Sequence, residues 1–169
     1  MKLKKILYSI LFFFFFQSYC IALCLTDKVD IGDPLSKVSK KLKSPPITKP
    51  IPGKKGEELG VPGPLVCSNE VFKETGLSYI FYEDQLTEIM GYKFTGTKLD
   101  LLNWLEKEFG KVKKETKELD TNAKATEFTW DKDILFIFYA MRRNENETTE
   151  FFKITSKRYE KLIKGNKNE

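Results

Sequence analysis

The sequence predicts an α+β fold, in which two helix-plus-antiparallel-hairpin halves pack as one mixed helix-on-sheet domain. Residues 77–94 and 125–140 each have the pattern of two apolar, aromatic-rich strands joined by about three polar residues, as in a β-hairpin. Their turns align, because residues 82–86 and 130–134 both run from an aromatic and an acidic residue through two polar residues to an aliphatic one. The apolar fraction of 41% and the aromatic fraction of 14% are typical of a globular chain.

Residues 1–22 have the three parts of a secretory signal peptide. Three lysines precede the apolar run of residues 6–16, and small residues allow cleavage after Ala22. Residues 23–169 then form a single domain that is exported, to the periplasm or out of the cell. Two alternatives stay open. Lipoprotein processing before Cys24 would give an outer-membrane lipoprotein, and a retained leader is long enough to span a membrane.

Export gives the cysteines a structural meaning, because thiols in an oxidising compartment pair when geometry permits. Cleavage after Ala22 leaves Cys24 and Cys67, which allow a single connectivity. We therefore predict a Cys24–Cys67 disulfide. The alternative is an isolated Cys67 thiol, with Cys24 acylated or held in a retained anchor.

The first predicted helix begins at Asp33 and Pro34, with Asp as N-cap and Pro at the first helical position. Leu35, Val38 and Leu42 then form a narrow apolar stripe between lysines. Residues 44–66 hold six of the seven prolines, so we expect a Pro/Gly-rich loop there, either a mobile insertion or a recognition loop.

The first hairpin follows, with Leu86, Met90, Tyr92 and Phe94 mostly alternating on its second strand. A capping box from Thr97 to Asp100 opens the second helix, and Gly110 ends it. The charged residues 111–124 are expected to be a solvated connection or a helix extension. The second hairpin follows, with residues 134–139 apolar on both faces, then a last strand at 150–155 and a short basic helix that ends at Gly165.

This order indicates an internal repeat of residues 30–94 and 97–155, although coincidence between common elements is the alternative. The helices end 67 residues apart, at Leu42 and Phe109, whereas the aligned turns lie 48 residues apart. An insertion of about the length of the Pro/Gly-rich segment into the first copy would explain the difference.

A local motif in the first helix resembles a known family. Gly32, Val38, Leu42 and Pro45 have the spacing G-x5-V-x3-L-x2-P. This spacing resembles the helical signature of small outer-membrane lipoproteins of the SmpA/OmlA type, and the element order is similar to the tandem architecture of β-lactamase inhibitor proteins. The resemblance implies repeated helix-plus-sheet units and a role in envelope assembly or in enzyme inhibition.

Composition excludes several chemistries. The chain has no histidine, so His-based triads, His metal sites and imidazole acid–base catalysis are absent. Without residues 1–22 there are 26 basic and 24 acidic residues, too small a surplus for a typical nucleic-acid binder. We expect no cofactor and no metal. The remaining catalytic candidates are carboxylate pairs that also suit polar turns: Glu83, Asp84, Asp131 and Asp133.

The aromatic residues suggest a surface. Alternation sends Ile80, Tyr82 and Ile89 to the opposite face of the first hairpin, with Trp130 at the matching turn. If no second layer covers that face, these four residues form an exposed patch suited to a partner.

We therefore expect an exported, non-catalytic protein-binding module of the bacterial envelope, acting as an assembly accessory or as an enzyme inhibitor. Its partner would be a protein in the envelope or outside the cell, and not nucleic acid. Membrane contact is expected only if Cys24 is lipidated or if the leader is retained. The alternative is a small envelope hydrolase that uses paired carboxylates.

Overall fold

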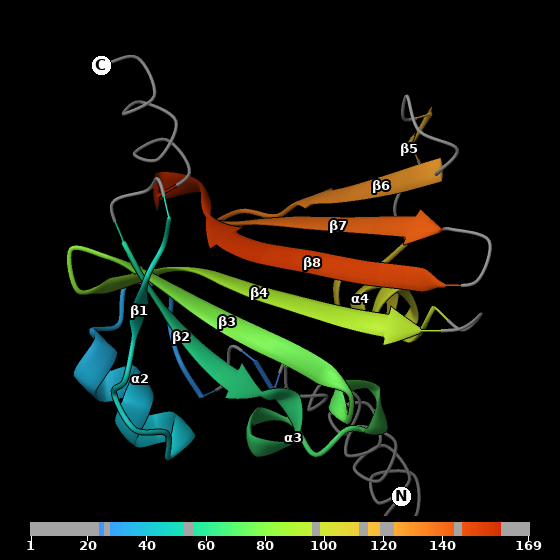
Figure 1. The fold of residues 1–169 in the computed structure, drawn as a ribbon. Coiled ribbons are helices and arrows are strands. Elements are labelled where there is room, and N and C mark those ends of the chain that lie inside the picture. Colours follow the sequence, from blue (N-terminus) through green and yellow to red (C-terminus); the bar gives the residue numbers. More distant parts are fainter. Residues whose placement is uncertain are drawn as a thin grey trace, which may run out of the picture.

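The computed structural model describes residues 24–25, 28–52, 56–95, 99–111, 115–118, 124–143 and 147–159, and it confirms the α+β class. One antiparallel sheet has the strand order β1-β2-β3-β4-β8-β7-β6-β5 (Figure 1). Its strands are β1 (Lys49–Pro50), β2 (Glu57–Pro62), β3 (Thr75–Tyr82), β4 (Gln85–Thr95), β5 (Glu115–Glu118), β6 (Lys124–Asp131), β7 (Leu135–Arg143) and β8 (Thr148–Ser156). The helical elements are α2 (Leu35–Leu42), α3 (Gly63–Val66), the 3-10 turn η1 (Glu70–Phe72) and α4 (Asp100–Phe109).

The element order repeats. Helix α2 is followed by β1 to β4, which we call the first half, and helix α4 is followed by β5 to β8, the second half. The strand order of the second half mirrors that of the first, and β4 pairs with β8 along a central seam. Each half is therefore one helix and a four-stranded meander, and the last strand of each half lies at the centre of the sheet (Figure 1).

This topology changes the expected equivalence of the hairpins. β2 and β6 start 67 positions apart, at Glu57 and Lys124, which equals the spacing of the helix ends. By element order, hairpin β3–β4 corresponds to β7–β8, and not to β6–β7 as the turn alignment suggested. The Pro/Gly-rich segment is the counterpart of β5–β6, so no insertion is needed to explain the spacing.

Two expected connections contain strands. Residues 44–66 include β1, β2 and α3, because the prolines fall where strand hydrogen bonds are not required: Pro50 in the edge strand β1 and Pro62 at the end of β2. Similarly, the charged segment 111–124 contains β5, the opposite edge strand. Charged residues and prolines are typical of edge strands, and this makes them easy to mistake for loops.

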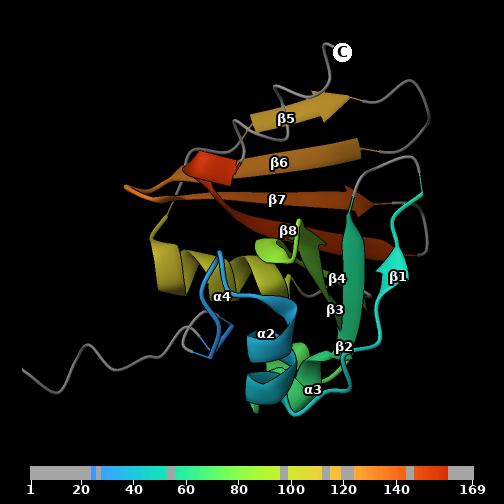
Figure 2. The ribbon, with the colours of Figure 1, turned by 90° about the vertical axis from the view of Figure 1, so that its left-hand side faces the viewer.

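Helices α2 and α4 lie on the same side of the sheet (Figure 2), which we call the covered face. Val38 and Leu42 of α2 and Leu101 and Leu105 of α4 are buried there. The strands contribute alternate residues, chiefly Leu59, Val61, Leu77, Tyr79, Phe81, Leu86, Ile89, Phe128, Trp130, Ile137, Tyr139, Phe152 and Ile154. At about 1.5–3 kcal/mol for each large side chain, this burial is the main stabilising contribution to the fold.

The first hairpin has a tighter turn than the sequence suggested. Glu83 and Asp84 alone connect its strands, and both have positive φ, of 51° and 59°, as a two-residue type I′ turn requires. A bulge follows, because Ile80 pairs with Glu88 whereas Phe81 pairs with Leu86. Thr87 is the extra residue, and its hydroxyl donates to Ile80 O at 3.1 Å.

Neither helix has the predicted N-cap, although α4 ends at Gly110 as predicted. Pro34, and not Asp33, is the N-cap of α2, and Leu99 is the N-cap of α4, while Thr97 lies outside the described residues. Carboxylates from distant parts of the chain take the capping role, one from a turn and one from a strand. Asp84 accepts from Leu35 N at 3.1 Å. In α4, Leu101 N donates to Glu150 Oε2 at 3.4 Å, and Leu102 N donates to Glu150 Oε1 at 3.1 Å.

A polar cluster joins the two halves on the covered face. Glu150 is fully buried and also accepts from Tyr139 Oη at 2.8 Å. Lys93 lies opposite Glu150 in the strand register across the seam. Its Nζ donates to Asp100 Oδ2 at 3.3 Å and to Val71 O at 3.1 Å. Burial and the neighbouring Glu150 carboxylate raise the pKa of Tyr139. These contacts give the buried charges the partners that charges in a low-dielectric interior require.

The predicted disulfide is present. Cys24 and Cys67 are bonded, with their Cα atoms 5.5 Å apart. The bond ties the start of the described chain to the residue after α3, and Cys67 is buried. The predicted leader (1–22) and most of the predicted basic C-terminal helix lie outside the described residues. Among those that are described, no helix is long and apolar enough to cross a membrane.

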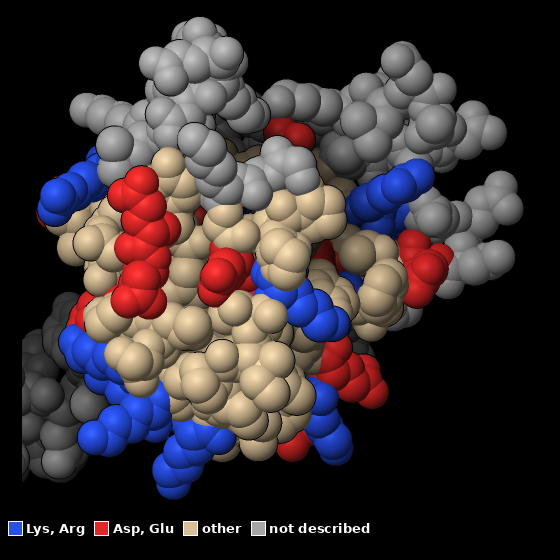
Figure 3. Space-filling model, turned by 60° about the vertical axis from the view of Figure 1, so that its left-hand side comes forward, with Lys and Arg blue, Asp and Glu red and all other residues tan. Residues whose placement is uncertain are grey.

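Charge is unevenly distributed over the surface. Figure 3 shows basic side chains gathered at the lower left of the view, where α2 lies, and acidic side chains above them.

Lys37 and Lys41 of α2 form ion pairs with Asp33, at 2.5 and 3.2 Å. Burial alone would raise the pKa of Asp33, but hydrogen bonds from Lys37, the Asp30 amide and Lys41 together lower it.

Candidate functional site: the open face of the sheet

The sheet face opposite α2 and α4 carries no helix of the described residues, and we call it the open face (Figures 1 and 2). Strand register places several aromatic residues there, and four of them lie close to the seam and are called the aromatic strip: Tyr92, Phe94, Phe138 and Phe151. They come from β4, β8 and β7, so the strip crosses the seam and both halves contribute to it. A strip of this kind is a candidate binding surface.

The first-half end of the aromatic strip is the more exposed. Tyr92 is 49% and Phe94 58% exposed, and their ring centroids lie 6.2 Å apart in an edge-to-face arrangement. The Tyr92 ring lies over Gly76 of β3, where an added Cβ would stand 2.5 Å from the ring. Glycine at this position therefore lets the ring lie across the sheet.

The second-half end is partly buried by its own neighbours. Phe151 lies directly opposite Tyr92 across the seam, and its ring centroid is 6.3 Å from that of Phe138. Both side chains are half-buried. They extend the exposed apolar surface of Tyr92 and Phe94 toward the centre of the second half.

Polar side chains border the aromatic strip. Lys153 pairs with Glu88 at 3.7 Å, and the Ser78 hydroxyl donates to Glu58. Arg142, on β7, is exposed on the same face. An apolar centre with a polar rim is the arrangement found in specific protein interfaces.

The four residues predicted as the partner surface do not lie together. Ile80 and Tyr82 are on the open face, with Ile80 9% exposed, but Ile89 and Trp130 are buried on the covered face. The bulge at Thr87 places Ile89 on the covered face, because one extra residue reverses the direction of every later side chain in β4. Trp130 packs in the core instead, and its Nε1 donates to Gly110 O at 2.6 Å.

The same bulge brings Met90, Tyr92 and Phe94 to the open face, although Leu86 keeps its place in the core. A strictly alternating pattern assigns all four to one face. The expectation that residues 134–139 are covered on both sides was also wrong, because Ile134 is an exposed turn residue and Phe136 and Phe138 are only half-buried. The sequence had therefore assigned part of the exposed aromatic surface to the interior.

The four candidate catalytic carboxylates lie on two separate turns. Glu83 and Asp84 form the β3–β4 turn, whereas Asp131 and Asp133 lie at the β6–β7 turn, and β8 runs between the two hairpins. Asp84 caps α2, and Asp131 forms an ion pair with Lys157. Within the described part of the chain, no cluster of three or more Cys, Asp or Glu side chains is arranged to hold a metal ion.

Comparison with known proteins adds no assignment: no family model, curated protein or solved structure matches this chain. The resemblance of the first helix to the SmpA/OmlA signature stays a prediction.

Proposed function

We propose that the protein is an exported, non-catalytic binding module of the bacterial envelope, which holds a protein partner on the open face of its sheet. The observation that carries this proposal is the aromatic strip. Burying rings that are 49% and 58% exposed on a preformed sheet gains hydrophobic free energy with little loss of conformational freedom. Aromatic residues, including phenylalanine, are also enriched at the centres of protein interfaces relative to the rest of the surface.

The disulfide supports an exported location. A disulfide persists in oxidising compartments, which agrees with the secretory pattern of residues 1–22. Cys24 uses its Sγ atom in this bond, and lipidation would need the same atom. The disulfide therefore favours a periplasmic or secreted protein over an outer-membrane lipoprotein.

Two roles fit such a module: an assembly accessory or an enzyme inhibitor. Both require tight occupation of the open face and neither requires catalytic groups. The hydrolase alternative needs its carboxylates in one cleft, and their separation on two turns leaves it without a supporting observation.

Site-specific photo-crosslinking in an exporting bacterial host tests the proposal. A photoreactive phenylalanine analogue is placed at Phe94, and at Ile134 as the control, because Ile134 is 74% exposed but lies at a turn outside the aromatic strip. We expect a discrete protein adduct from position 94 and none from position 134. The adduct should disappear when Tyr92→Ser or Phe151→Ser is added.

The crosslinked protein is then purified, and its affinity for the wild type and for Phe94→Glu is measured. We expect at least a tenfold loss, since removing one dominant interface residue costs roughly 2 kcal/mol or more. Equal adducts from positions 94 and 134, or an affinity that Phe94→Glu leaves unchanged, would refute binding through the open face.

A further inference from the structure

A second surface lies at the α2–α3 end of the molecule, which we call the basic end: Lys28, Lys40, Lys41, Lys43 and Leu65. Residues 28–43 contain five lysines and two aspartates, a net charge of +3. Residues 23–169 together carry only +2, so the rest of the domain is slightly acidic. This segment therefore carries more net positive charge than the domain as a whole.

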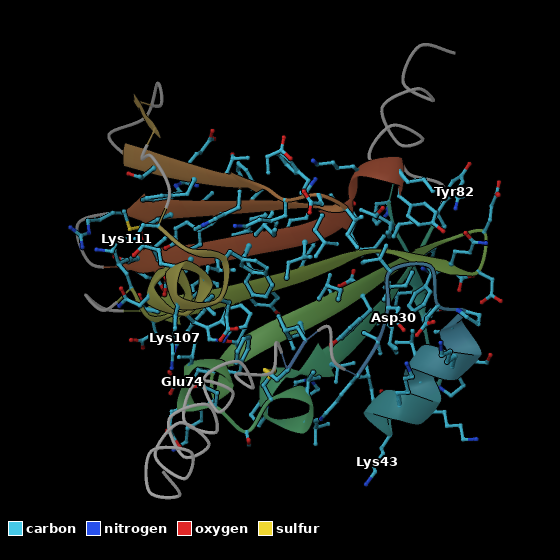
Figure 4. The ribbon with its side chains drawn as sticks, turned by 180° about the vertical axis from the view of Figure 1, so that it is seen from behind. Asp30, Lys43, Glu74, Tyr82, Lys107 and Lys111 are labelled. Atoms are coloured by element: carbon cyan, nitrogen blue, oxygen red, sulfur yellow. A yellow bond between two sulfur atoms is a disulfide. The ribbon has the colours of Figure 1, made fainter. Side chains whose placement is uncertain are left out.

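The lysines of this segment differ in their contacts. Lys37 and Lys41 are paired with Asp30 and Asp33, and these pairs neutralise the two aspartates. Within the described residues, Lys40 and Lys43 have no carboxylate partner. Figure 4 shows Lys43 pointing away from the sheet at the end of α2. The net charge is therefore directed outward.

An exposed apolar side chain accompanies this charge. Leu65, on α3, is 60% exposed and lines a shallow hollow together with Lys28, Lys41 and Lys43. Lys28 Nζ donates to Val66 O at 2.7 Å, which joins the basic segment to α3. Pro64 is at the start of this short helix and restricts its backbone. A leucine surrounded by lysines is suited to shallow insertion below a layer of anionic headgroups.

The disulfide places the preceding chain at the same end. Cys24 is bonded to Cys67, two positions after Leu65. The chain that precedes Cys24 therefore enters the domain beside the basic end.

We infer that the basic end contacts a membrane surface rich in anionic lipid. The segment contains lysines and no arginine, and lysine acts as a point charge without the planar geometry that binds one phosphate bidentately. Diffuse positive charge with one apolar side chain fits a fluid layer of phosphate headgroups better than a single anion. This contact is independent of the open face, and it leaves the aromatic strip free for a protein partner.

Vesicle co-sedimentation with the disulfide-bonded protein, as recovered from an exporting host, tests the inference. Vesicles of phosphatidylglycerol mixed with phosphatidylcholine are compared with vesicles of phosphatidylcholine alone. We expect binding to the anionic vesicles only, and we expect it to weaken as salt shortens the range of charge interactions. Lys40→Glu with Lys43→Glu should lower the partition coefficient by at least about tenfold, given that each lysine near such a surface is worth about 1 kcal/mol.

The matched control is Lys107→Glu with Lys132→Glu, an equal change of charge at exposed positions outside the basic end. It should keep most of the binding. Leu65→Ser should weaken binding by a few-fold at every salt concentration, because it removes an apolar contact and no charge. Equal loss in both lysine pairs, or equal binding to neutral vesicles, would overturn the inference. Unchanged circular dichroism of the variants confirms that each is folded.

Discussion

The two halves have the same element order, and each helix is capped in a corresponding way. Leu35 N donates to Asp84 and Leu101 N donates to Glu150, and in both cases the carboxylate comes 49 positions later in the chain. The burial of the two carboxylates differs. Asp84 is exposed at a turn, whereas Glu150 is fully buried and also bonded to Tyr139. The same topology therefore carries a weak cap in one half and a strong one in the other.

The halves also differ in how their ends are fixed. The first half has the Cys24–Cys67 disulfide, and its helix ends at Lys43 with a left-handed φ of 52°. The second half has no cysteine. Its helix ends at Gly110, whose carbonyl accepts from Trp130. A covalent bond stabilises the first half, while buried polar contacts stabilise the second, which shows that one topology does not require one set of interactions.

Removal of the disulfide should have the largest effect. Cys24→Ser with Cys67→Ser should lower the free energy of unfolding by about 4 kcal/mol on the loop-entropy model, because the bond closes a sequence separation of 43 residues. Chemical denaturation of the oxidised wild type and the double variant measures this loss. Hydrogen exchange should show faster opening of α2 and β2 than of α4 and β7. Equal acceleration in both halves would contradict a disulfide that stabilises the first half locally.

Loss of the buried cap should come next. Glu150→Gln keeps the size of the side chain but places an amide donor among the donors of Leu101, Leu102 and Tyr139, at a cost of about 2–3 kcal/mol. Asp84→Asn is the matched change in the first half, and it should cost only about 0.5–1 kcal/mol because Asp84 is exposed. Urea denaturation of both variants tests the comparison. Equal losses would mean that burial does not distinguish the two caps.

Acid should weaken the contact between Asp33 and the lysines of α2 in the first half. The pKa of Asp33 is lowered in the folded protein, so its contribution to stability is present above its unfolded pKa of about 3.9 and is lost as pH falls through the lower folded value. Asp33→Asn should therefore cost about 1–2 kcal/mol at neutral pH and progressively less below about pH 4. Denaturation midpoints of both proteins across this range measure the difference. A difference that stays constant with pH would be inconsistent with an ionised Asp33.

The smallest effects concern the helix ends, and they should have opposite signs. Gly110 has φ of 86°, so Gly110→Ala should destabilise the second half by about 1 kcal/mol. Lys43 has φ of 52°, so Lys43→Gly should stabilise the first half by a similar amount. Thermal denaturation of both variants tests this pair. A change of the same sign in both would show that the conformation of these residues is not the deciding factor.

Local patterns in the sequence were sufficient for most elements. Alternating apolar residues predicted hairpin β3–β4 and strands β6 and β7, and the apolar stripes predicted α2 and α4, because these signals depend on nearest neighbours along one element. The disulfide followed from cysteine number and compartment. Strands β1, β2 and β5 and helix α3 were missed. The edge strands β1 and β5 depend on pairing with β2 and β6, and β2 and α3 lie in a segment whose prolines and glycines predicted a loop.

The candidate site was harder to predict. A single bulge at Thr87 decides which face Ile89 and Tyr92 occupy, and bulges leave no clear signal in one sequence. Tryptophan is common at interfaces, yet Trp130 packs in the core, where its Nε1 donates to the Gly110 carbonyl. This partner lies 20 positions earlier in the chain, so the local pattern around Trp130 does not indicate it. Likewise the cap of α4 comes from Glu150, far along the chain, and this contact could not be inferred from residues next to the helix.

The central seam has a consequence for folding during synthesis. β4 and β8 are the last strands of their halves, and they pair along residues 88–95 and 148–155. During synthesis, β4 therefore has an unpaired edge until most of the chain has been made. An unpaired strand edge is a template for pairing with other chains. A holding chaperone, or delayed folding until β8 arrives, would protect newly made molecules from aggregation. Truncation before residue 148 would leave that edge permanently open.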